Sequence, residues 1–213
     1  MLLDRSHQIL ASVASKDFSR PVLSGIHVMP DYAEAADGFM MLRLPRAHTG
    51  GYGEPKARGK PIKKRSGIIL PAKAVKEALR ALPKRGRGDT PAHEVMAVGR
   101  RNGAGVLSTL TSTAEIPAIT GTFPKVSPLI PKRVVHGEES GTATVYTMAL
   151  APACLAIIAK AAKDLGAIAV RFQTTSPSAP VRLDFVDADN ADVYGPPVGV
   201  VMPMAVHADK PRA

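Results

Sequence analysis

The chain has little of several features that mark out whole classes of protein. Its 213 residues include one cysteine, no tryptophan and only 4% aromatic residues. The single thiol, Cys154, excludes an internal disulfide and any metal site built from several cysteines, and this favours a reducing cytoplasm as the compartment. The scarcity of aromatic side chains disfavours binding that depends on stacking nucleic-acid bases.

Long apolar runs and catalytic motifs are also missing. No apolar run approaches the ~20 residues that span a bilayer, and charge enters the amino-terminal MLLDRSHQ too early for a signal peptide. The six histidines are scattered, with no pair at metal-ligand spacing, and no glycine-framed nucleophile is present. The sequence therefore predicts a protein that is not an enzyme, holds no metal or cofactor, and has no membrane partner.

Positive charge, by contrast, is abundant. Lysine and arginine total 28 against 18 aspartate and glutamate, a formal net charge of +10, while 45% of the residues are hydrophobic and suffice for a core. Such an excess favours nucleic acid or another anionic surface as a partner, without identifying which.

The rest of the predicted fold is arranged around residues 66–87. Its opening SGIIL reads as a short buried strand, Pro71 suits the first position of a helix, and residues 72–82 have helical periodicity. One side of this helix carries Val75, Leu79 and Leu82, and the other carries Lys73, Lys76 and Arg80. The cationic side suits a polyanion bound outside the core, and an ordinary solvated face is the alternative.

The amino-terminal part of the chain predicts one helix and three strands. Residues 4–15 form the helix, capped by Asp4. Residues 20–29 form a strand, and residues 33–44 contain two more strands with a tight turn at Asp37-Gly38.

Residues 45–65 are rich in glycine, proline and cations, with little to bury, and predict a mobile basic loop. Its cations contact DNA or keep the protein soluble: Lys56, Arg58, Lys60, Lys63, Lys64 and Arg65. Residues 95–98 and 105–110 then predict paired strands around a turn at 100–103, and the proline-rich residues 114–133 predict an extended connector.

Residues 142–204 repeat the pattern of one helix accompanied by strands. Residues 142–148 predict a strand, and residues 152–165 predict a helix with Leu155, Ile158, Ala162 and Leu165 inward and with Lys160 and Lys163 outward. Three further strands follow at 167–173, 181–186 and 198–204. One helix with antiparallel strands thus occurs three times at roughly 70-residue spacing, and the sequence predicts an α+β fold of three such units.

Five segments of the chain carry a resemblance to one family: RPVLSGIHV (20–28), AADGFMMLRL (35–44), IILPAKAVKEALRALP (68–83), FPKVSPLIPK (123–132) and VGVVMPM (198–204). Together they resemble the bacterial β sliding clamp, the ring-shaped processivity subunit of the replicative DNA polymerase. In the clamp family each of three domains contains two half-modules, and a dimer closes twelve half-modules into a ring. Residues 1–132 resemble the middle domain, and residues 133–213 resemble the end of the last domain.

The resemblance implies an assembly and its partners. Three half-modules per chain would require four copies for a ring of twelve, so a homo-tetramer is favoured over a dimer or trimer. The implied partners are double-stranded DNA, a clamp loader, and the replicative polymerase with other client peptides.

The resemblance also implies a hydrophobic groove that receives client peptides. Its positions are Leu23, Ala36, Gly38, Phe39, Met40, Met41, Pro124, Pro128, Leu129, Val200, Met202, Pro203 and Met204. Methionine adapts to varied apolar ligands and proline holds a wall at low entropic cost, which agrees with a promiscuous peptide site. The methionines could instead fill gaps in the core. Phe39 and Met40 stand where the family has histidine and arginine.

The second implied surface is the inner face of a ring, where cations meet DNA phosphates without reading sequence. The candidates are Lys73, Lys76, Arg80, Lys84, Arg85, Arg87, Lys160 and Lys163. Three functions stay open at this point: a ring-forming clamp, a clamp-derived module that binds only peptides, and a basic DNA-binding protein that needs no ring.

Overall fold

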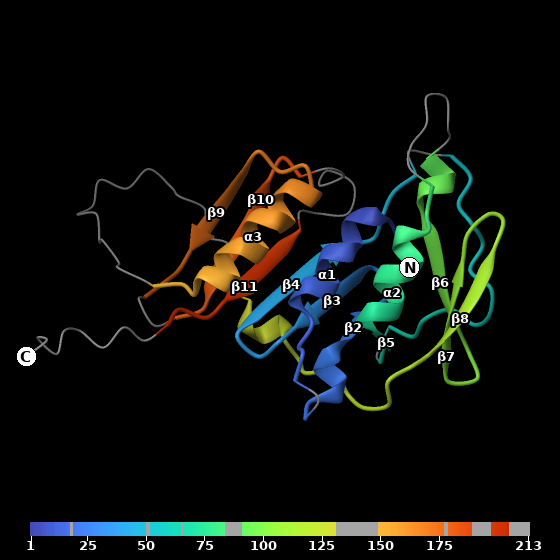
Figure 1. The fold of residues 1–213 in the computed structure, drawn as a ribbon, viewed down its shortest axis with the longest axis horizontal. Helices are drawn as coiled ribbons and strands as arrows, with labels where there is room; N and C mark the ends of the chain where they lie inside the picture. The colour runs from blue at the N-terminus through green and yellow to red at the C-terminus, as the bar shows by residue number, and fades with distance from the viewer. Residues whose placement is uncertain are drawn as a thin grey trace, which may run out of the picture.

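Two antiparallel sheets make up the framework of the protein. The computed structural model describes residues 1–17, 19–49, 52–64, 66–83, 91–130, 149–176, 179–188 and 197–204. Within these ranges the smaller sheet has the order β1-β6-β7-β8, and the larger has the order β5-β2-β3-β4-β11-β10-β9. The helices α1, α2 and α3 lie on one side of the larger sheet (Figure 1).

The first module opens with a capped turn. Its elements are β1 (Leu2–Leu3), the 3-10 helix η1 (Arg5–Ile9), α1 (Leu10–Val13), the 3-10 helix η2 (Pro21–Ser24), β2 (Gly25–Val28), β3 (Tyr32–Ala36) and β4 (Met40–Pro45). Asp4 caps η1 as predicted, since its side chain accepts a hydrogen bond from the Ser6 backbone N–H at 2.9 Å. The helix predicted over 4–15 is shorter than predicted, and only Leu10–Val13 of it is α-helical, but its inward residues Ile9, Leu10 and Val13 are buried as predicted. The chain leaves it after Val13, because the Ser15 N–H donates to the Leu23 carbonyl instead of continuing the helix.

The strand predicted over 20–29 is confirmed only for its second half. Residues Pro21–Ser24 form η2, because Pro21 has no N–H to give to a strand ladder. The strand begins at Gly25, where a β-carbon would lie 2.5 Å from the Ile69 side chain. A glycine is needed there for the two strands to pack.

The second module follows the predicted strand and helix closely. Its elements are β5 (Ile68–Pro71), α2 (Ala72–Arg80), the 3-10 helix η3 (Pro91–Glu94), β6 (Met96–Arg101), β7 (Ala104–Ser108) and β8 (Thr113–Pro117). Val75, Leu79 and Leu82 are buried, as predicted. Pro71 is the N-cap of α2 and not its first residue, because its ψ of 123° is still extended.

The β6–β7 turn is confirmed, with Asn102 and Gly103 at φ values of 45° and 80°. The connector predicted over 114–133 is wrong at its start, because Thr113–Pro117 pairs with β7 as strand β8. The proline-rich remainder of the connector contains the short 3-10 helix η4 (Ser127–Leu129).

The third module contains α3 (Pro152–Asp164), β9 (Ala169–Gln173), β10 (Val181–Val186) and β11 (Val198–Val201). The strand predicted at 142–148 lies outside the described residues. Ile158 and Leu165 are buried as predicted, but Leu155 is 45% exposed. The inward stripe of α3 runs through Cys154, Ile158, Ala161 and Leu165, and Leu155 is turned about 100° away from Cys154 around the helix.

The modules exchange their first strands. β1 of the first module pairs with β6 of the second, and β5 of the second pairs with β2 of the first. The third module joins the first through β11, which pairs with β4 so that Val200 lies opposite Met41. One large core fills the space between the helices and the sheets. The predicted α+β fold of three half-modules is confirmed.

In the predicted basic loop, residues 45–49 and 52–64 are described, and their backbone is held more firmly than the composition suggests. Ile62 is buried in the main core and Pro55 is also buried. Lys60 forms an antiparallel bridge with Arg100. The prediction that this loop has little to bury is therefore wrong, because these apolar residues lie among the cations. In the ranges that the structure describes, no helix is both long enough and apolar enough to cross a membrane.

Candidate functional site

An apolar pocket opens where the first module, the third module and the connector between β8 and α3 meet. Its volume is about 150 Å³. The first module lines it with Leu23, Ala36, Gly38, Phe39, Met40 and Met41, the connector with Pro124, Val126 and Leu129, and the third module with Val200 and Met202.

The floor of the pocket follows from the period of two along β4. Met40, Leu42 and Leu44 belong to the main core on the helix side of the sheet. Met41 points to the other side and joins a second apolar cluster with Ala36 and Val200. Met41 pairs with Ala36 in β3 and with Val200 in β11, so three neighbouring strands each give one side chain to the floor.

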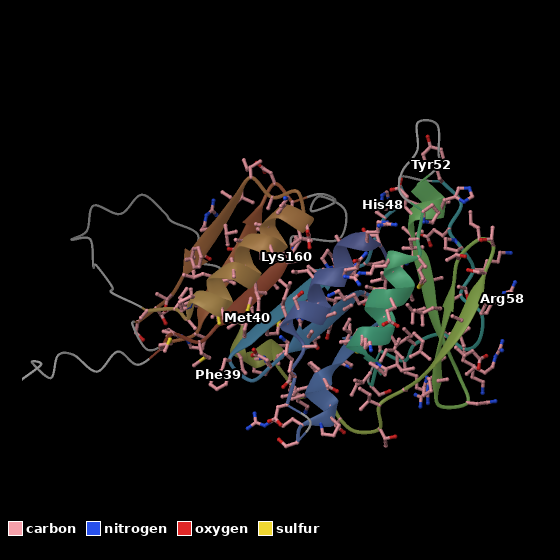
Figure 2. All side chains as sticks on the ribbon, in the orientation of Figure 1. Phe39, Met40, His48, Tyr52, Arg58 and Lys160 are labelled. Carbon is pink, nitrogen blue, oxygen red and sulfur yellow. The ribbon has the colours of Figure 1, made fainter. Side chains whose placement is uncertain are left out.

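The β3–β4 turn places an aromatic side chain at the mouth. Asp37 accepts hydrogen bonds from the backbone N–H groups of Phe39 and Met40, both at 2.8 Å, and Gly38 has a φ of 101°. The Met202 N–H donates to the Phe39 carbonyl at 2.9 Å, which ties the turn to the end of β11. Figure 2 shows Phe39 and Met40 together at this end of β4.

The pocket has a closed floor and an open mouth. Met41 is 5% exposed and Val200 is 6% exposed, whereas Phe39 is 72%, Leu129 59% and Met202 42% exposed. Flexible and aromatic apolar side chains at an open mouth can adjust to an apolar ligand from solvent.

A polar network on the same sheet face holds the connector wall in place. The Glu34 side chain is 3% exposed, lies 2.9 Å from the His27 Nδ1 and accepts two hydrogen bonds from Arg43 at 2.7 and 2.9 Å. Arg43 Nη2 also donates to the Ser127 Oγ at 2.9 Å, and the His27 ring stacks on Phe123 at 4.8 Å. The network thus connects β2, β3 and β4 to the segment that lines the pocket.

Tyr32 completes the network. The Arg43 guanidinium lies over its ring at 4.1 Å from the centroid, a cation–π contact. Burial first, and then the Glu34 carboxylate, raises the pKa of the Tyr32 hydroxyl, so this group is neutral at physiological pH.

The chemistry of the lining restricts what the pocket can do. None of the lining residues carries a titratable group, so the pocket offers neither an acid, a base nor a charged nucleophile. Among the described residues, no group of three or more histidine, cysteine, aspartate or glutamate side chains could hold a metal ion. The arrangement suits the binding of apolar side chains.

The structure brings most of the predicted groove residues around this one pocket. The exceptions are Pro128, Pro203 and Met204, which do not line it. Val126 lines it and was missed, although it is an apolar residue between Pro124 and Pro128 in the same connector. Met40 and Met41 are buried although they line the pocket, and Met202 and Met204 are 42% and 55% exposed, so the last two do not fill gaps in the core.

Five of the predicted DNA-binding cations belong to α2 and α3, on the helix side of the larger sheet. Lys73 and Arg80 are exposed on α2, Lys76 is half-buried there, and Lys160 and Lys163 are exposed on α3. Lys160 forms an ion pair with Asp164 one turn later. The predicted residues Lys84, Arg85 and Arg87 lie outside the described residues.

Comparison with solved structures identifies the fold. The chain superposes on the DNA polymerase III beta chain from Streptococcus pneumoniae TIGR4 with a TM-score of 0.62 and 15% identity over 97% of this chain and 64% of that one. The C. crescentus beta sliding clamp gives a TM-score of 0.62 and 15% identity over 97% of this chain and 65% of that clamp. A sliding clamp (DNA polymerase III subunit beta) from Bartonella birtlesii, bound to griselimycin, gives a TM-score of 0.59 and 18% identity over 97% and 66%.

These matches show that the chain has the fold of the DNA polymerase III beta sliding clamps, at low sequence identity. It spans about two thirds of the length of the clamps that it matches. No protein-family model and no curated protein matches the sequence.

Proposed function

We propose that the protein is a sliding-clamp-like processivity factor, which encircles duplex DNA as a ring of identical copies and binds client peptides in the apolar pocket. The observation that carries the proposal is the separation of two surfaces by one sheet. The helices with Lys73 and Lys160 lie on one side of the sheet, and the pocket floor at Met41 faces the other. A protein built this way can hold DNA phosphates on one side while a partner occupies the other.

The helix side of the sheet, which is the proposed DNA-binding side, suits contacts with DNA that do not depend on its sequence. Lysine and arginine on the helix surface attract phosphates without reading base edges, and a protein that slides needs this kind of contact. The proposed role is non-enzymatic. A replicative polymerase and other clients would bring an apolar peptide to the pocket, and a clamp loader would open the ring.

Free sheet edges support the assembly of several copies. Within the described residues, β8 and β9 each have a strand neighbour on one side only. Leu155, Ile168 and Phe172 are exposed on or next to α3 and β9, at 45%, 78% and 41%. Open strand edges beside apolar side chains favour pairing with another chain. Three half-modules per copy make a tetramer the assembly that would supply a ring of twelve.

Retention of the protein on circular and on linear duplex DNA tests the proposal directly. A ring stays on a nicked circular duplex at high salt and leaves when the circle is linearised, whereas simple phosphate contact is lost from both substrates as salt rises. Light scattering of the free protein gives the number of copies. Equal loss from circular and linear DNA, together with a monomeric mass, would refute the ring.

A second function is a peptide-binding module that forms no ring. It is supported by the pocket itself, whose apolar mouth residues Phe39, Leu129 and Met202 are exposed and need no DNA to receive a peptide. Such a module would bind an apolar peptide but would be retained on neither DNA substrate.

A further inference from the structure

The cation-rich residues 56–64 have a fixed backbone. Lys60 and Arg100 exchange two backbone hydrogen bonds, each 2.8 Å long. The Arg58 N–H donates to the Ser108 Oγ at 3.4 Å. Buried Pro55 precedes the segment, and Ile62 within it is also buried. The segment is therefore attached to β7 at Arg58 and to β6 at Lys60.

Two glycines allow this close attachment. A β-carbon on Gly59, which has a φ of 93°, would lie 2.7 Å from the Arg100 carbonyl oxygen. A β-carbon on Gly99 would lie 2.4 Å from the Arg58 carbonyl oxygen. Any other residue at either position would push the segment away from the sheet.

The fixed backbone carries five exposed cations: Lys56, Arg58, Lys60, Lys63 and Lys64. In the part of the chain that the structure describes, none of these five side chains forms an ion pair. Arg100 adds a further exposed cation from β6, whereas its neighbour Arg101 is paired with Glu115. Because the backbone is already ordered, the protein loses less conformational entropy when a polyanion binds here than it would if this segment were a free loop.

The composition of the segment distinguishes between polyanions. It contains no aromatic side chain on which a base could stack. Its lysines reach phosphates as point charges, and Arg58 can contact a phosphate through two N–H groups. An acidic peptide would gain the same charge attraction, but the segment forms no part of a described apolar pocket that would hold the peptide's other side chains.

We propose that residues 56–64, with Arg100, form a second nucleic-acid surface that binds the phosphate backbone. Figure 2 shows Arg58 at the end of the molecule away from Lys160, beside the four-stranded sheet. This surface is separate from the cations of α2 and α3, and it needs no ring. It would hold a stretch of nucleic acid that does not pass along those helices.

The experiment compares two triple variants of the full chain, each lacking two lysines and one arginine. Lys56→Ala/Arg58→Ala/Lys63→Ala changes the proposed surface. Lys73→Ala/Lys76→Ala/Arg80→Ala changes α2. Binding to a short linear duplex is measured by fluorescence anisotropy over a range of salt concentrations, and a single strand of the same sequence is the second probe.

The first variant should bind the duplex about tenfold or more weakly at low salt, and the slope of log K against log salt should shrink by about 2 to 3, since each phosphate contact contributes about 0.9. The α2 variant should keep most of the affinity and of the slope. Lys56→Arg/Lys63→Arg should bind like the unchanged protein, because it retains the charges. A similar loss with the single strand would show that phosphates and not duplex shape are recognised, as proposed.

Three results would overturn the proposal. The first is binding by the Lys56/Arg58/Lys63 variant within twofold of the unchanged protein. The second is an equal loss in both triple variants, which would indicate net charge alone. The third is competition by polyglutamate as effective as competition by DNA. Retention on nicked circles at high salt tests the ring separately, so this surface and the ring can fail independently.

Discussion

Removal of the Arg43 guanidinium tests whether the polar network supports both the fold and the pocket wall. Arg43→Met keeps most of the apolar stem but removes the guanidinium that pairs with the Glu34 carboxylate, which then keeps only its contact with the His27 ring. Glu34 is 3% exposed at its side chain and Arg43 is 17% exposed. Breaking a fully buried ion pair costs about 3–5 kcal/mol, so with this partial exposure of Arg43 we expect about 2–3 kcal/mol of lost unfolding free energy.

The same substitution at a solvent-exposed pair is the matched control. Arg101 and Glu115 are 49% and 47% exposed, so Arg101→Met should cost less than about 1 kcal/mol. Urea unfolding followed by circular dichroism measures both changes. Arg43→Met/Glu34→Met should be more stable than Arg43→Met alone, because it also removes the buried Glu34 carboxylate that has lost its guanidinium partner.

The network also predicts an effect on the pocket. Arg43→Met removes the hydrogen bond to Ser127, so the connector wall should shift and an apolar peptide should bind several-fold more weakly. Isothermal titration with such a peptide measures this change. The reasoning is refuted if Arg43→Met costs no more than Arg101→Met and leaves peptide binding unchanged.

Three further predictions concern other regions. Met202→Asp places a charge at the exposed mouth of the pocket and should abolish binding of an apolar peptide, whereas Ile168→Asp, at an exposed residue that does not line the pocket, should leave it intact. Burial alone would raise the pKa of Asp4, but the His7 imidazole and the Ser6 hydrogen bonds outweigh it and lower the pKa to about 2 from 3.8. The resulting stability, about 2 kcal/mol, should be complete above pH 4 and lost as the pH falls to about 2, and an Asp4→Asn variant should lack this loss in acid unfolding. Gly59→Ala keeps the net charge but collides with the Arg100 carbonyl, so it should weaken linear-duplex binding several-fold, and unchanged binding would show that the fixed backbone is unimportant.

Local signals in the sequence were enough for the elements whose side chains have one clear periodicity. The buried stripe of α2 and the turns at Asp37-Gly38 and Asn102-Gly103 were predicted correctly, because helical spacing and positive φ are properties of a few adjacent residues. Strand β8 was missed because its edge position leaves most of its residues exposed, so it lacks the apolar run that marks a buried strand.

The pocket was predicted only through resemblance to a family. Its lining comes from η2, the β3–β4 turn, the connector and β11, and no local pattern links such distant segments. Val126 was missed for the same reason, since a valine between prolines has no spacing that points to a pocket. The Glu34 network was missed too, because its partners His27 and Arg43 come from neighbouring strands and depend on their register.

The sequence by itself determined the order of most elements, the basic character of the chain and the inward face of α2, because backbone preference and apolar periodicity act over a few residues. Only the tertiary structure decided that β4 pairs with β11, that Arg43 meets Glu34 and Ser127, and that the cations of residues 56–64 lie fixed against β6. These contacts join residues far apart in the chain, and they form only when the strands pair in one register and the modules pack together.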